Sequence, residues 1–108
     1  MSIRDLYAKL PKECPEYLDF VRSLPSAASG RIGCVAHHRI GGRLSQHKTS
    51  DFEAMPLTDD EHRELHAGMD AFVEKHGRTE SDMVKATLLE AIRLGVLVID
   101  KRAARELA

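Results

Sequence analysis

Residues 34–42 read CVAHHRIGG, and this stretch places two histidines between a short apolar run and a pair of glycines. The apolar pattern of residues 31–36 (RIGCVA) predicts a short strand. Neighbouring residues on a strand point to opposite faces, so one pocket can hold both His37 and His38 only where the strand ends. The pair is therefore either a coincidence or two groups with different tasks.

The residues that follow predict a hairpin and then a helix. Residues 37–50 form a long loop rich in glycine, serine, histidine and basic residues, and long loops in compact domains are usually functional. Residues 51–55 (DFEAM) alternate and can return as a second strand. Thr58 and Glu61 have the spacing of a capping box, which starts a helix. These elements predict a ββα unit.

Further helices are expected on both sides of this unit. A short helix can form over residues 2–10, and Pro15 suits the first turn of the next helix. Gly77 is expected to end a helix, and Thr79 can cap another. We therefore expect an α+β fold, mostly helical by content, in a single domain over residues 1–108: an N-terminal helical segment (1–25), the ββα core (26–68) and C-terminal helices (69–108).

Composition narrows the class of protein. The chain has 108 residues and a formal net charge of −1, so it carries no overall basic signal for nucleic acid. Its two cysteines, Cys14 and Cys34, are too few for a disulfide scaffold. No run approaches the ~18 apolar residues of a membrane span, and no signal peptide is recognisable. We expect a cytoplasmic protein with no membrane partner.

A second pair of histidines lies in the helix predicted after Thr58. His62 and His66 are four residues apart, so they share one helix face and can hold one cation. The plainer alternative is an exposed helix that carries two histidines by chance. In a ββα unit the strand end faces the first turns of the helix. His37 can then join the pair around one metal, while His38, beside the metal, can act on water.

Four pieces of the sequence together resemble a known family. The runs AHHRIGG, SDFEAMPL, EHRELHAG and FVEKHGRTE, within about residues 25–80, resemble the HNH, or ββα-metal, nuclease superfamily. Within it the chain is most similar to small phage HNH nucleases of the RecA-dependent recombination type. The resemblance implies a bacterial or phage-encoded, metal-dependent endonuclease that hydrolyses DNA phosphodiester bonds.

The resemblance also implies a role for each matching residue. His37 and His62 correspond to metal ligands, and His66 to a third ligand or a phosphate contact. His38 corresponds to the general base, and Asp51 takes the place of the asparagine that orients this base. The implied cofactor is one divalent metal ion, Mg²⁺ or Mn²⁺ for activity, in a site that Zn²⁺ or Ni²⁺ can also occupy.

The residue types suit this chemistry and its substrate. Histidine has a pKa near 6.5, so it is partly available as a base near neutral pH. A divalent metal polarises the phosphate and holds the departing oxygen. Arg39, Arg43 and Lys48 are candidates for contacts to the phosphates of DNA, the expected partner. A recombinase filament, another phage or host protein, and a second copy of the chain are further candidate partners.

The chain departs from the family where many members bind a second, structural zinc through cysteines. Ser26 and Ser29 stand in place of a cysteine pair, and Thr58 in place of a further cysteine. Hydroxyl groups are poor zinc ligands beside thiolates, so no structural zinc is expected. Packing, for example from helices over 15–24 and 80–94, must then replace it.

This departure leaves two alternatives to an active nuclease. One is a catalytically silent module of the same fold that binds nucleic acid or a partner protein. The other is a small helical protein whose histidines bind nothing.

Overall fold

A two-stranded antiparallel hairpin lies at the centre of the molecule. The computed structural model describes residues 9–41 and 49–108. Strand β1 (Val35–His38) pairs with β2 (Ala54–Leu57), with Val35 opposite Leu57 and His38 opposite Ala54. The chain between the strands ends in a short 3₁₀ helix, η1 (Asp51–Glu53).

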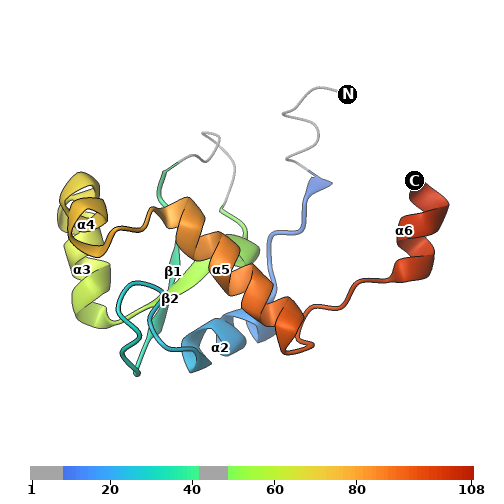
Figure 1. Cartoon of the computed structure of the whole chain (residues 1–108), viewed down its shortest axis with the longest axis horizontal. Coiled ribbons are helices and arrows are strands. Elements are labelled where there is room, and N and C mark those ends of the chain that lie inside the picture. The colour runs from blue at the N-terminus through green and yellow to red at the C-terminus, as the bar shows by residue number, and fades with distance from the viewer. Residues whose placement is uncertain (1–8, 42–48) are drawn as a thin grey trace.

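Helices surround this hairpin, so the fold is α+β and mostly helical, as expected. In the described part of the chain they are α2 (Pro15–Ser23), α3 (Asp59–Ala67), α4 (Met69–His76), α5 (Glu80–Arg93) and α6 (Lys101–Leu107). Figure 1 shows α5 running across the hairpin, α3 and α4 together at one end, and α6 standing away from the rest. Each described helix is too short or too polar to span a lipid bilayer.

Local signals in the sequence set the helix ends. Pro15 occupies the first turn of α2, and Thr58 forms the predicted capping box at the start of α3. Gly77 ends α4 in the left-handed conformation, with a φ of 71°, and Thr79 caps α5. The helix expected over residues 2–10 lies almost entirely outside the described residues.

The first strand lies further along the chain than its apolar pattern predicts. A strand over residues 31–36 is wrong, because β1 begins only at Val35. Gly30 and Gly33 have φ values of 78° and 84°, and such left-handed glycines turn the chain instead of extending it. His37 therefore lies within the strand, and the loop expected from this residue onward begins after β1.

The return strand is displaced in the same direction. A strand over residues 51–55 is wrong at its start, because Asp51–Glu53 forms η1. The Ser50 hydroxyl accepts a hydrogen bond from the Phe52 amide and caps this turn. Strand β2 then runs through Pro56, which a two-stranded sheet accommodates because each strand has an unpaired edge.

Strand β2 is buried on both faces, and its two faces meet different helices. Met55 and Leu57 pack in one apolar cluster with residues of α3, α4 and α5: Leu65, Phe72, Met83 and Val84. Ala54 packs in a second cluster with residues of α2 and α5: Tyr17, Val21 and Ala91. His37 is paired with Met55 and His38 with Ala54, so the two imidazoles lie on the α3 and α2 sides of the hairpin respectively.

Candidate metal centre

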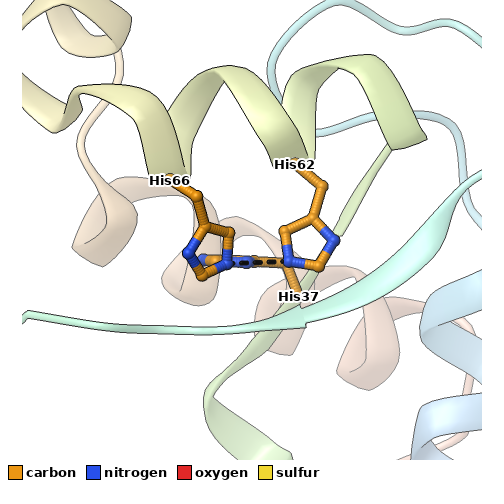
Figure 2. A group of neighbouring side chains, drawn as sticks. All are labelled: His37, His62 and His66. Carbon is orange, nitrogen blue, oxygen red and sulfur yellow. Dashed lines mark hydrogen bonds between the residues drawn. The ribbon is translucent and has the colours of Figure 1, made fainter.

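Three of the predicted histidines converge between β1 and α3. His62 and His66 project from α3 toward His37 on β1 (Figure 2). One ring nitrogen from each residue lies within 4.8 Å of the other two, and the Nε2 atoms of His62 and His66 are 2.9 Å apart. Nitrogen ligands about 2.1 Å from a tetrahedral zinc ion are about 3.4 Å from one another. Since the three nitrogens already lie within 4.8 Å of one another, small rotations of the rings would allow all three to bind one cation.

The environment of two of these rings, His37 and His62, favours the neutral form that binds a metal. His37 is 2% exposed, and its burial lowers its pKa, although the hydrogen bond with Glu80 opposes this effect. Burial and the neighbouring His66 lower the pKa of His62 as well. Both imidazoles are therefore neutral near pH 7, and a neutral imidazole is the ligand that divalent metals require.

A buried carboxylate from α5 holds the first of these rings. Glu80 Oε2 lies 3.0 Å from His37 Nε2 and accepts a hydrogen bond from the amide of Ile40 at 2.8 Å. Glu80 Oε1 accepts a further hydrogen bond from the amide of Gly41 at 2.9 Å. Burial alone would raise the pKa of Glu80, but these hydrogen bonds outweigh it and lower the pKa. The carboxylate is thus charged and fixed beside His37.

The fourth predicted histidine lies on the opposite side of β1. His38 Nε2 is 2.8 Å from Asp51 Oδ1, and the His38 side chain is 36% exposed. Asp51 is buried, and its Oδ2 accepts a hydrogen bond from the Cys14 amide at 2.8 Å. The Asp51 amide also donates to the Lys12 carbonyl. The carboxylate that contacts His38 is therefore held by the chain just before α2.

The predicted phosphate contacts are only partly described. Arg39 donates to the Gly41 carbonyl at 2.7 Å and to the Ser81 hydroxyl at 3.0 Å, and its side chain is 19% exposed. Its Nη1 also lies 3.9 Å from Glu53 Oε1, so the guanidinium ties the end of β1 to both α5 and η1. Arg43 and Lys48 lie outside the described residues.

The positions at which the resemblance places zinc-binding cysteines meet around a carboxylate. Glu61 is fully buried, and its Oε1 accepts hydrogen bonds from the Ser26 hydroxyl at 2.6 Å and the Thr58 amide at 2.9 Å. Its Oε2 lies 3.3 Å from Arg31 Nη2. Burial would raise the pKa of Glu61, but its hydrogen-bond donors lower it to about 2. The charged carboxylate of Glu61 thus connects the turn that contains Ser26 to the start of α3 through hydrogen bonds.

The roles of two buried carboxylates, Glu61 and Glu80, are not recognisable from the sequence. The sequence predicts Glu61 only as part of the capping box of its own helix, because its contact with Ser26 spans 35 residues of the chain. Glu80 was missed altogether, since a glutamate in the first turn of a helix is common and its partner His37 is 43 residues away. No pattern in the neighbouring sequence distinguishes a charged residue that the fold buries from one that stays exposed.

Comparison with known proteins identifies the family but not an activity. Residues 6–95 match the family described as "Protein of unknown function (DUF968)". Neither the curated proteins nor the solved structures include a match to this chain. Because the matched region spans most of the 108 residues, the chain belongs to the DUF968 family.

Proposed function

We propose that the protein is a metal-dependent endonuclease of the HNH, or ββα-metal, type that hydrolyses DNA phosphodiester bonds. The observation that carries this proposal is the distribution of four imidazoles over one ββα unit. His37, His62 and His66 converge on one point, while His38, the next residue on the same strand, is held separately by Asp51. The HNH resemblance assigns metal binding and proton transfer to these same residues.

His37, His62 and His66 would hold the ion in the proposed enzyme. Three protein ligands leave coordination positions open, as in catalytic sites and unlike closed structural zinc sites. A divalent ion bound there would polarise the scissile phosphate and neutralise the charge that develops on the leaving oxygen. Burial of His37 and the fixed position of Glu80 favour this reading over two chance histidines on an exposed helix.

His38 has the features that a general base requires. A charged Asp51 can only accept a hydrogen bond, so the nearby Nε2 of His38 carries the proton in the neutral ring and Nδ1 carries the lone pair. The exposed fraction of the ring allows water to reach it. Asp51 would orient the ring and stabilise the imidazolium that forms when Nδ1 takes the proton from water, a division of roles shared with other carboxylate–histidine pairs.

DNA is the proposed substrate on chemical grounds and through the resemblance. Arg39 directly follows His38 in the chain, and its side chain is 19% exposed. Arg43 and Lys48 would supply further contacts to backbone phosphates, which position a duplex without reading its sequence. Such contacts predict that binding weakens as the salt concentration rises.

Cleavage of supercoiled plasmid in the presence of Mg²⁺, Mn²⁺, Ni²⁺ or Zn²⁺ tests this function. Loss of a general base costs about 10²- to 10⁴-fold in rate, and this is the reduction expected for His38→Ala. His76→Gln is a matched control, because His76 pairs with Glu64 between α3 and α4 and lies outside the three-histidine cluster.

The pattern of results separates the alternatives. Cleavage that His38→Ala leaves unchanged would show that the base is wrongly assigned. A protein that binds Zn²⁺ and DNA but cuts with none of these metals would instead be the catalytically silent module. The absence of any metal binding by calorimetry near neutral pH would refute the metal-dependent function.

A further inference from the structure

Glu80 is tied to the candidate metal centre by three hydrogen-bonding contacts, although it belongs to a different helix. Its carboxylate, with a side chain only 3% exposed, contacts His37 and the amides of Ile40 and Gly41. The backbone at Gly41 lies against this carboxylate, since a Cβ added there would be in ordinary van der Waals contact with Glu80 Oε1, at 3.4 Å. The two amides anchor the carboxylate independently of the imidazole.

This anchoring restricts the hydrogen-bonding state of the ring. A carboxylate has no proton to donate, so the neutral His37 ring must carry its hydrogen on Nε2 to satisfy the contact at 3.0 Å. The nitrogen that remains with a lone pair is then Nδ1. Metal-binding histidines commonly donate their other ring N–H to a carboxylate, which sets the orientation of the ring and makes the ligand nitrogen more basic.

We propose that Glu80 is a positioning residue that fixes the Nε2–H tautomer of His37 and presents Nδ1 to the cation. The proposal rests on the metal site of the proposed function and is independent of nuclease activity. It makes the first turn of α5 part of the centre, in addition to β1 and α3. It also predicts a mixed donor set, with Nδ1 from His37 and the facing Nε2 atoms from His62 and His66.

Two measurements on the whole chain test the role of Glu80. Long-range ¹H–¹⁵N spectra of the histidine rings report the tautomer of His37 without added metal, and titration calorimetry with Zn²⁺ reports the affinity of the site. Wild-type protein is expected to show only the Nε2–H tautomer. Glu80→Ala is expected to show a mixture of tautomers and an affinity for Zn²⁺ reduced about 10- to 100-fold.

Two further variants separate positioning from folding. Glu80→Gln keeps the volume of the side chain, but its amide group must turn an N–H toward the N–H of Ile40 or Gly41. This variant is therefore expected to bind Zn²⁺ more weakly than the wild type. It keeps the proposal testable if Glu80→Ala fails to fold. Asp82→Asn is the matched control, because Asp82 caps the same helix without contacting His37. In this variant the tautomer of His37 and the affinity for Zn²⁺ are expected to match those of the wild type.

The results distinguish this proposal from the proposed function. An Nδ1–H tautomer in the wild type, or an unchanged Zn²⁺ affinity in a folded Glu80 variant, would overturn the role of Glu80. Wild-type protein that binds Zn²⁺ through the predicted nitrogens but cuts no DNA would leave this role supported and count against the nuclease alone. Wild-type protein that binds no Zn²⁺ would overturn both.

Discussion

Acid is expected to weaken the fold through the carboxylate of Glu61. Hydrogen bonds to this buried side chain lower its pKa from an ordinary value of 4.5 to about 2 in the folded protein. The unfolded chain therefore takes up the proton first as the pH falls. The stabilising contribution of Glu61 is complete above about pH 5 and is lost progressively as the pH approaches about 2.

The size of this contribution follows from the shift in pKa. One pKa unit corresponds to about 1.4 kcal/mol, so a shift from 4.5 to about 2 stabilises the folded state by about 3 kcal/mol at neutral pH. By about pH 3 less than half of this contribution remains. The value is a substantial fraction of the about 5–15 kcal/mol by which a typical domain is stable.

Urea unfolding between neutral pH and about pH 3 measures this effect. The free energy of unfolding of wild-type protein should fall with acid more steeply than that of Glu61→Gln, whose side chain does not titrate. Subtracting one curve from the other isolates Glu61 from other carboxylates that titrate in this range, such as Glu80. Asp60→Asn, at the neighbouring and 80% exposed carboxylate of α3, is the matched control.

Parallel curves for wild-type protein and Glu61→Gln would refute the reasoning, because they would mean that Glu61 titrates alike in the folded and unfolded states. A change in Asp60→Asn as large as that in Glu61→Gln would also contradict it. Such a result would assign the effect to the negative charge near the start of α3, and not to the hydrogen bonds with Ser26 and Arg31.

Three further outcomes are expected. Zn²⁺ at about 100 times its dissociation constant should raise the free energy of unfolding by about 3 kcal/mol, and a chelator should reverse this in urea titrations. Asp51→Ala should lower the rate of plasmid cleavage but leave the Zn²⁺ affinity measured by calorimetry equal to that of the wild type. The reason is that Asp51 contacts His38, on the side of β1 opposite the three-histidine cluster. Phe72→Ala should cost about 3–5 kcal/mol in thermal or urea unfolding, because Phe72 is fully buried, whereas Leu107→Ala, at 88% exposure, should cost under about 0.5 kcal/mol.

The sequence predicted the parts of this fold that depend on short-range patterns. The capping box of Thr58 and the C-cap at Gly77 were identified correctly because the residues that make them are neighbours in the chain. The spacing of His62 and His66 likewise placed both on one face of α3, where the structure has them. The class, a hairpin with a helix and additional helices, followed from these elements.

The sequence could not predict features that depend on backbone conformation or on distant partners. The start of β1 was misplaced because Gly33 is compatible with a strand pattern, and only its left-handed φ shows that the chain turns there. Arg39 reads as a solvent-exposed base in a loop, whereas its guanidinium contacts Ser81, 42 residues later. Glu80 is the extreme case, because it is buried where α5 packs against the hairpin and its contacts, His37, Ile40 and Gly41, are about 40 residues away in the chain.

The adjacency of His37 and His38 on β1 constrains how this protein can vary. One peptide unit separates the ring beside α3 from the ring beside Asp51, and the alternation of the strand alone directs them apart. A residue inserted or deleted just before His37 would turn both imidazoles to the opposite face of the hairpin in a single event. Natural lengthening or shortening of the chain should therefore spare β1 and accumulate in the connection that follows it.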